Sequence, residues 1–429
     1  MAGALVLAAM FAALLAGIDV AFALAGLGVV LLLLADFSPL MIPQALMSSM
    51  DNFILLSVPL FILMSNILLR GGAGEDLFGA VQSWVGHWPG GLAVATVLSC
   101  AIFASISGSS VATSATIGTV AIPAMVTRGY QRRFTYGLLA AGGTLGILIP
   151  PSIPMIIYGF VTGESIIELF LAGIGPGVLL TLMFIAYAVV RARLKRDYVA
   201  TARADARQRI AASRRALPAL ALAVLIVAGI YFGAFTPTEA AAIGFAGALV
   251  ITMVVNRTLR PADLAPIALD SMRTSVMVLF IIAGAKVFGQ AITLYQIPQD
   301  VTAAVVGGLA TPGAFIVVIC ALLLAMGCVL ETLSMMLLML PVIQPSLIGL
   351  NIDAIWFGVI FTMMIECALI TPPVGLNLFV IRAVAAQGGR VVTVADVVYG
   401  TLPFVVLILI AVAITTALPD LALFIPRSL

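Results

Sequence analysis

The stretches that decide the fold are GGTLGILIPP, residues 142–151, and ALITPPVG, residues 368–375. Neither can be a regular helix throughout, because proline has no N–H to donate and its ring clashes with the backbone one turn earlier. The residue before each proline is also pushed out of the α region, and nearby glycines let the backbone leave the helix at little cost. Two adjacent prolines in both stretches favour a true helix break over a simple kink.

The composition places these breaks inside a membrane. Of the 429 residues, 63% are hydrophobic and 9% are charged, whereas soluble proteins carry charges on about a quarter of their residues. Apolar runs of about 18 residues or more recur along the chain, and each is long enough to cross a bilayer as a helix. Period-2 alternation is absent, so a β-barrel is excluded. The predicted fold is an all-α polytopic membrane protein surrounded by lipid.

Basic residues give the predicted orientation. Nine of the 20 lie within residues 191–215, and smaller groups occur at 128–133 and 257–260. The positive-inside rule puts all three groups in the cytoplasm. We interpret 191–215 as a solvated cytoplasmic loop, not as a nucleic-acid or lipid-binding patch. The apolar start is interpreted as the first span and not as a removed signal peptide. Spans are predicted near 2–17, 20–35, 51–69, 134–160, 166–190, 216–234, 238–256, 266–293, 353–386 and 398–425.

Two further apolar regions, 89–127 and 311–347, are interrupted midway by polar or small residues. Under the charge-derived topology each must begin and end on one side of the membrane, which predicts two re-entrant hairpins. Non-helical backbone at membrane depth is tolerated only where it is buried or lines a cavity. Each hairpin tip is therefore expected to mark a site.

The prolines also indicate an internal repeat. Pro89, Pro123 and Pro150 in the first half have counterparts in Pro312, Pro345 and Pro372, and the last two of each set are equally far apart. The broken helices at 134–160 and 353–386 enter from opposite sides, so the repeats are inverted, as in many secondary transporters. The predicted organisation is scaffold spans at 1–70, a first repeat at 71–190, the basic loop at 191–215, scaffold spans and the start of the second repeat at 216–293, and the rest of that repeat at 294–429.

The first hairpin tip reads SISGSSVATS, residues 105–114. Hydroxyls and freed carbonyls are ligands that sodium prefers, and a small-residue packing seam would need only one such residue per turn. Ionisable residues inside spans are candidates for function. Glu331 and Thr332 lie at the second tip and Glu366 precedes the second break. Lys286, in an otherwise apolar helix, could meet an anionic substrate or neutralise Glu331 or Glu366.

Several activities are excluded by what the sequence lacks. The lysines are Lys195 and Lys286, and neither stands in a Gly-Lys-Ser/Thr phosphate loop. One histidine rules out the usual metal sites and catalytic triads. An intramembrane enzyme would depend on Glu331 and Glu366 as its acidic pair, and a channel would need a continuous polar stripe that is absent. Transport must then draw on an ion gradient or on a partner chain, and no enzymatic activity is expected.

The chain resembles the large membrane subunit of the tripartite ATP-independent periplasmic (TRAP) transporters over essentially its whole length. The most specific stretches are GSSVATSATIG at 108–118, FTPTEAAA at 235–242 and LITPPVGLN at 369–377, and SVPLFILM at 57–64 fits as well. Pro237, with Thr236 before it and Glu239 after it, is also typical of a helix start.

The resemblance implies an elevator mechanism, a location in the bacterial inner membrane and coupling to two or more sodium ions, with no organic cofactor. It also implies a small four-span membrane subunit, a periplasmic substrate-binding protein and an organic-acid substrate. The implied sodium ligands are Ser107, Ser109, Gly146, Ile149 and Pro151 at a first site, and Gly327, Ala368, Thr371 and Val374 at a second. Candidate substrate residues are Ser110, Thr113, Lys286, Glu331 and Thr332.

A stand-alone sodium-coupled dicarboxylate or citrate carrier would share the hairpin architecture. The stretch FTPTEAAA argues against that alternative.

Overall fold

In a computed structural model, the described residues (2–195, 198–199, 201–308, 311–327, 330–373, 375–387 and 392–428) form helices and their connections, without a strand. Seven helices among them are long and apolar enough to cross a membrane. The prediction of an all-α polytopic membrane protein is confirmed. Val374, a predicted sodium ligand, lies outside the described residues.

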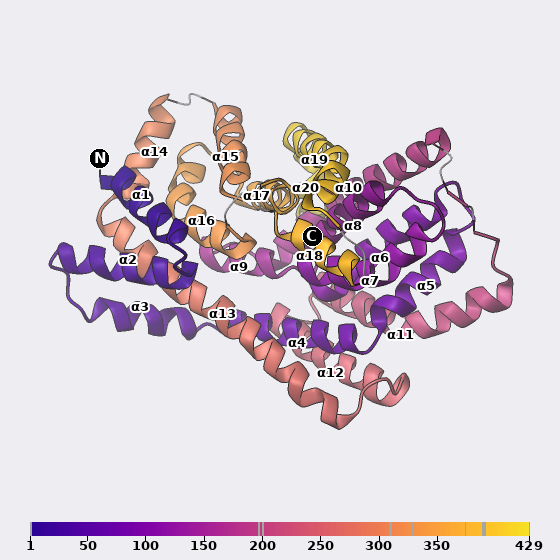
Figure 1. Ribbon diagram of the computed structural model, residues 1–429. Helices are drawn as coiled ribbons and strands as arrows, with labels where there is room; N and C mark the ends of the chain where they lie inside the picture. The colour runs from indigo at the N-terminus through magenta and orange to yellow at the C-terminus, as the bar shows by residue number, and fades with distance from the viewer. Residues whose placement is uncertain are drawn as a thin grey trace.

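Six helices form one layer along the lower edge of Figure 1. The longest, α13, has 34 residues and spans about 50 Å at 1.5 Å per residue. Helices α2, α3 and α4 pack against it, α12 packs against α4, and α11 against α12. We call this set the scaffold layer. Its members are α2 (Val20–Leu34), α3 (Met41–Met50), α4 (Ser57–Arg70), α11 (Ala206–Tyr231), α12 (Pro237–Leu249) and α13 (Pro261–Leu294).

Above that layer in Figure 1 lie the two helical hairpins and the two broken helices. The hairpins are α6 (Gly91–Ser107) with α7 (Ser110–Val126), and α15 (Pro312–Met326) with α16 (Thr332–Gly349). The broken helices are α8 (Arg132–Thr144) with α9 (Ile153–Thr162), and α17 (Ala354–Leu369) with α18 (Leu376–Ala386). Three further helices complete this set, which we call the hairpin layer: α10 (Ile166–Lys195), α19 (Val394–Ala417) and α20 (Asp420–Arg427).

The broken helices form the core of the hairpin layer. Helix α8 is buried at every position from Phe134 to Thr144, and α17 at every position from Phe357 to Leu369. Helices apolar on all sides are expected to be enclosed by other helices. Both breaks therefore lie deep inside packed protein, where irregular backbone is tolerated in a membrane.

The two broken helices run antiparallel. The Tyr158 hydroxyl of α9 donates to the Ala354 carbonyl at the start of α17 at 2.7 Å. At the other end, the Asn377 amide of α18 donates to the Ala140 carbonyl of α8 at 3.2 Å. The hairpins also pack across the two halves of the chain: α7 packs on α18, and α16 packs on α9. Each half thus contacts the second segment of the other half's broken helix.

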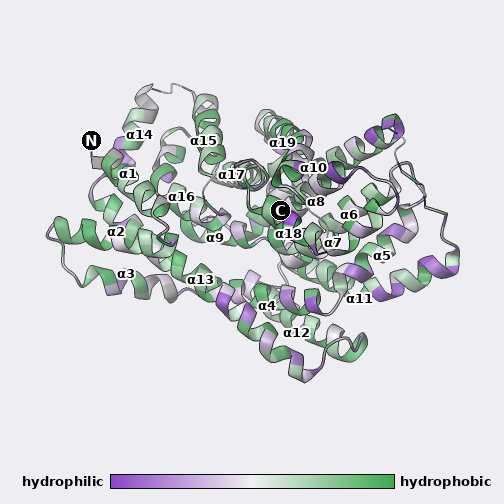
Figure 2. Ribbon diagram, viewed as in Figure 1, coloured by the Kyte–Doolittle hydropathy of each residue, from purple (hydrophilic) through white to green (hydrophobic). Residues whose placement is uncertain are grey.

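Charged contacts give the layer its orientation. Arg133 at the start of α8 pairs with Asp396 at the start of α19, 2.9 Å apart, so both helices begin on the basic, cytoplasmic side. Asp353, which precedes α17, lies 3.6 Å from Arg427 of α20. Since α20 follows the far end of α19, α17 begins on the outer side. Figure 2 shows hydrophilic residues gathered at the ends of α10 and α11, where the basic stretch lies.

The structure corrects part of the predicted organisation. The basic stretch 191–215 is largely helical, because α10 continues to Lys195 and α11 begins at Ala206, after a capping box formed by Asp205 and Gln208. The predicted span 398–425 is divided into α19 and α20 at Pro419. Sequence analysis also missed three helices: α3, α5 (Ala73–Val85) and α14 (Ile297–Gly308). The predicted span 238–256 contains α12 together with a π-helical end at Val250–Val255. Helix α1 (Ala2–Leu15) follows its predicted span closely.

The crossing of α8 and α19 offers a test of this packing. A Cβ on Gly137 would lie 1.9 Å from the Gly400 carbonyl oxygen, so backbone faces backbone with no side chain that could move. We expect Gly137→Ala to lower the free energy of unfolding by about 1–3 kcal/mol, as overpacked cores do. Thermal unfolding in detergent measures the change. Gly26→Ala is the control, because no atom lies within 4 Å of its added Cβ; equal midpoints for both variants would refute the crossing.

Candidate functional site

The first break separates α8 from α9. After Thr144 the chain makes a 3-10 turn over Leu145–Ile147, and the Pro150–Pro151 peptide is cis. Neither proline can donate to the carbonyl one turn earlier, which would be that of Gly146 or Ile147. The Ser152 hydroxyl donates to the Ile147 carbonyl at 2.5 Å and also accepts from the Met155 N–H as the cap of α9. Gly146 is thereby left at the break with a carbonyl that no proline N–H can reach.

The second break repeats this arrangement between α17 and α18, again with a cis Pro372–Pro373 peptide. Ala368 stands at the position equivalent to Gly146, four residues before the first proline. Its carbonyl accepts the Thr371 N–H at 3.1 Å. The Thr371 hydroxyl donates to the Cys367 carbonyl at 2.6 Å. Oxygen atoms therefore gather at this break as well.

The first hairpin tip packs directly on the first break. The hydroxyls of Ser107 and Thr113 lie 2.7 Å apart, and the Thr113 hydroxyl donates to the Ser109 carbonyl at 2.8 Å. A Cβ on Gly146 would lie 2.7 Å from the same Ser109 carbonyl oxygen. Because only glycine allows this approach, oxygen atoms of the tip lie directly against the backbone of the break at Gly146.

Gly108 at the apex completes the contact. Its φ of 58° lies in the left-handed region that favours glycine. A Cβ on Gly108 would meet the Pro151 carbonyl oxygen at 2.7 Å. The structure thus brings Ser107, Ser109, Gly146 and Pro151 together. The side chain of Ile149 faces Gly177 of α10 instead, so any part it plays would be through its backbone.

The second hairpin tip packs on the second break in the same way. A Cβ on Gly327 would lie 2.2 Å from the Cβ of Ala368. Gly327 and Ala368 are therefore brought together as the sequence suggested, with Thr371 one turn further along. The two tips thus approach the two breaks through equivalent positions, Gly146 and Ala368.

A pocket of about 460 Å³ lies between the two tips and the scaffold layer. Of the predicted substrate residues, Ser110, Glu331 and Thr332 line it, as do Ser107 and Ser109. Thr113 is buried behind it, against Ser107. Lys286 lies elsewhere, in a separate cavity. Asn66 of α4 and Thr274 of α13 also line the pocket, and both were missed because neither stands near a proline or glycine signal.

Asn377 is a third residue whose role sequence analysis missed. It is fully buried and donates to the Ser110 hydroxyl at 2.5 Å. Its bond to Ala140 and this bond together join α18, the first hairpin and α8. The signal was present, since Asn377 ends the stretch LITPPVGLN.

Glu366 was a candidate for function and is fully buried, with no hydrogen-bond partner for either carboxyl oxygen among the described residues. It does not line the pocket. Lys286 forms no ion pair with Glu366 or Glu331 in the part of the chain that the structure describes, so the possible neutralising pair is not formed there.

Comparison with known proteins identifies relatives over nearly the whole chain. Residues 6–421 match the family "Tripartite ATP-independent periplasmic transporter, DctM component". A C4-dicarboxylate TRAP transporter large permease of Pseudomonas aeruginosa is 38% identical, over 89% of this chain and 88% of its own. An ectoine TRAP transporter large permease of Halomonas elongata is 35% identical over the same shares. The sialic acid TRAP transporter permease of Haemophilus influenzae is 34% identical, over 90% of this chain and 62% of its own.

Among solved structures, the YdaH transporter of Alcanivorax borkumensis shares the fold, with a TM-score of 0.59. The two chains are 14% identical, and the match covers 89% of this chain and 88% of the other.

The contact between the second tip and the second break can be tested with two glycine substitutions at opposite ends of α15. Gly327 has a helical φ of −64°, so Gly327→Ala tests the close contact and not backbone strain. We expect a loss of about 1–3 kcal/mol in the free energy of unfolding from overpacking, measured by thermal unfolding in detergent. Gly313→Ala, at the other end of α15, adds a Cβ with no atom within 4 Å. If both variants unfold alike, Gly327 does not pack on Ala368.

Proposed function

We propose that this chain, which belongs to the large permeases of the TRAP transporters, carries a small organic acid across the membrane together with sodium. Family membership makes it a transporter permease subunit of the bacterial inner membrane and not an enzyme. The observation that carries the sodium coupling is the convergence of hairpin-tip oxygens on a helix break at Gly146.

Two sodium sites are proposed, one at each break. Sodium is bound in transporters by unwound backbone carbonyls and helix ends near the membrane midplane. The first site would use oxygens of Ser107, Ser109, Gly146, Ile149 and Pro151, and the second those of Gly327, Ala368, Thr371 and Val374. The close approach of Gly146 to Ser109, and of Gly327 to Ala368, supports this assignment.

The charge of the pocket supports coupling to a cation. Glu331 is its one ionisable lining residue among those described, and Ser334 donates to its carboxyl group at 3.2 Å. An ionised Glu331 would repel an organic acid that enters this low-dielectric site. Sodium bound at both breaks would offset that repulsion. The proposed order is therefore sodium first and the organic acid second.

An elevator movement is proposed for the hairpin layer. The scaffold layer lies along one side of it, and two cavities lie between the layers. Sliding of one layer past the other would carry the pocket across the membrane without separating the tips from the breaks. Because each tip packs on its break through backbone and small residues, the hairpin layer is suited to move as a unit.

The family name and the relatives support the proposed partners. The family is tripartite, so we propose a small four-span membrane subunit and a periplasmic substrate-binding protein as partners. Relatives are named for C4-dicarboxylates, ectoine and sialic acid. We propose an organic acid, with a C4-dicarboxylate such as succinate as the first substrate to test. A stand-alone carrier is not favoured, because the match extends over residues 6–421.

Sodium coupling is tested by uptake into proteoliposomes that contain the chain and its two partners. Ser109→Ala and Thr371→Val each remove one hydroxyl at a proposed site. We expect each to raise the sodium concentration for half-maximal succinate uptake about tenfold, equivalent to ~1.4 kcal/mol. Ectoine and sialic acid are tried if succinate is not carried.

Thr119→Val is the matched control, because the Thr119 hydroxyl donates to the carbonyl four residues earlier, as that of Thr371 does, but on an exposed face of α7. Uptake that needs no sodium, or unchanged sodium dependence in both site variants, would contradict the proposed coupling. Uptake without the binding protein would favour the stand-alone carrier.

A further inference from the structure

A second cavity, of about 560 Å³, lies between the two layers. Helices α3 and α13 of the scaffold layer line one side, and α9, α14 and α16 line the other. Its α13 residues lie between Ile282 and Leu294, the end of that helix far from Arg260. Since the basic residues mark the cytoplasmic side, this cavity lies toward the outer side of the membrane. We call it the outer cavity.

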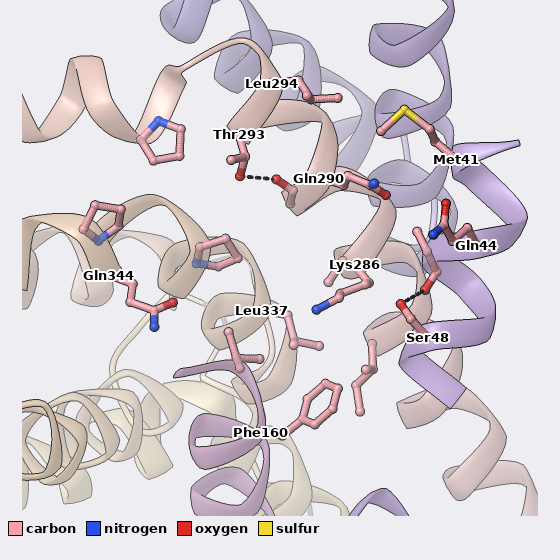
Figure 3. Close-up of a pocket in the computed structure, with 18 of the residues that line it drawn as sticks. Met41, Gln44, Ser48, Phe160, Lys286, Gln290, Thr293, Leu294, Leu337 and Gln344 are labelled. Atoms are coloured by element: carbon pink, nitrogen blue, oxygen red, sulfur yellow. Dashed lines mark hydrogen bonds between the residues drawn. The ribbon is translucent and has the colours of Figure 1, made fainter. Parts of the chain in front are cut away.

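Lys286 is the one charged residue that lines the outer cavity among the described residues. Its side chain is exposed, and no ion pair or hydrogen bond joins it to another residue in the part of the chain described. Figure 3 shows its ammonium group pointing away from α13 into the space bounded by Phe160, Leu337 and Gln344. A cation inside a transmembrane helix is normally paired or functional, and Lys286 has no partner among the described residues.

The neighbours of Lys286 are neutral amides. Gln44, Gln290, Gln299 and Gln344 line the cavity, and each amide nitrogen can donate two hydrogen bonds. Among the described residues, the Gln290 amide oxygen is buried without a hydrogen-bond partner, so this amide is not satisfied by the protein alone.

The hydroxyls that line the outer cavity already donate hydrogen bonds to the backbone. Those of Ser48 and Thr293 donate to backbone carbonyls, at 3.0 and 2.7 Å. The Gln344 amide also donates, to the Thr162 carbonyl at 2.9 Å. The donors available to a ligand are therefore the ammonium group and the amides of Gln44, Gln290 and Gln299. This set, with no acid beside it, is complementary to an anion.

We propose that the outer cavity binds the anionic group of an organic acid at Lys286 before the acid reaches the hairpin tips. The inference rests on the proposed function for the identity of the ligand as a transported acid, but not for its charge. The outer cavity and the Glu331 pocket contact different parts of α13. Lys286 lines the first, whereas Thr274, Met277 and Val278 line the second. The separation along the helix is about 12–18 Å at 1.5 Å per residue.

The outer cavity contains the basic Lys286 and the tip pocket contains the acidic Glu331, so we assign them different functions. The outer cavity attracts an anion without sodium, whereas the tip pocket holds a carboxylate and needs sodium. Lys286 would raise the local concentration of the acid on the outer side, as charged clefts do.

The test measures the charge of the cavity without requiring transport. Thr293→Cys places a thiol in the cavity, two helical turns from Lys286. The probes are two methanethiosulfonates, one carrying an ethylsulfonate and one an ethyltrimethylammonium group, applied from the outer side. We expect Lys286→Gln to reduce the ratio of anionic to cationic modification rates about fivefold, in keeping with loss of one unit charge nearby in a partly aqueous site. Lys286→Arg should keep the ratio of the parent.

Ser428→Cys is the control, because Ser428 is exposed at the end of α20 on the outer side, and its ratio should not respond to Lys286→Gln. Native thiols are corrected for with the parent chain. An unchanged ratio at Thr293→Cys would overturn the proposal, and so would a thiol that neither reagent reaches.

The sodium coupling and the outer cavity can fail separately. The variant Ser109→Ala should need about tenfold more sodium for half-maximal uptake, equivalent to ~1.4 kcal/mol, and keep the ratio at Thr293→Cys. Where succinate uptake is measured, Lys286→Gln should raise KM about fivefold with kcat kept, because Lys286 acts before the tips are reached. A fall in kcat at constant KM would move Lys286 to the transport step and overturn its role in access.

Discussion

The missing N–H groups of two proline pairs are the constraint on which the rest of the structure depends. In lipid every backbone polar group must find a partner within the protein, and Pro150, Pro151, Pro372 and Pro373 remove four donors at once. Their breaks can exist only in the packed centre of the molecule. The complete burial of α8 from Phe134 onward and of most of α17 follows from that requirement.

The two hairpin tips pack on the two breaks and so help to bury them. Each approach depends on a residue with little or no side chain: Gly146 against the Ser109 carbonyl, Gly108 against the Pro151 carbonyl, and Gly327 against Ala368. A carbonyl freed by a proline is negative, and a second carbonyl beside it is repulsive. A cation between them removes the repulsion. This geometry, which is unfavourable for the polypeptide alone, is the basis of the two proposed sodium sites.

The sequence predicted the parts of this design that local chemistry controls. Prolines fixed the breaks, the polar run at 105–114 located the first tip between α6 and α7, and Thr236 with Glu239 predicted the capped start of α12. The sequence-based prediction was wrong or incomplete for features that depend on tertiary packing. Helices α3 and α5 are short, and the basic stretch became helical because Asp205 caps α11. The distance between Lys286 and Glu331 depends on how α13 crosses the hairpin layer, which no local pattern records.

That crossing explains why one transporter contains an acidic pocket and a basic cavity along the same helix. An anion held only by Lys286 would be bound without regard to sodium, and transport would not be coupled. An anion that faced only Glu331 would be repelled until both cations were in place, and it would seldom arrive. With the positive charge on the outer side and the negative charge at the tips, the step that attracts the acid is separate from the step that couples it to sodium. In the proposed mechanism, coupling depends on the tips, where the charges of sodium and substrate balance, whereas the rate of arrival depends on Lys286, a residue of the scaffold layer.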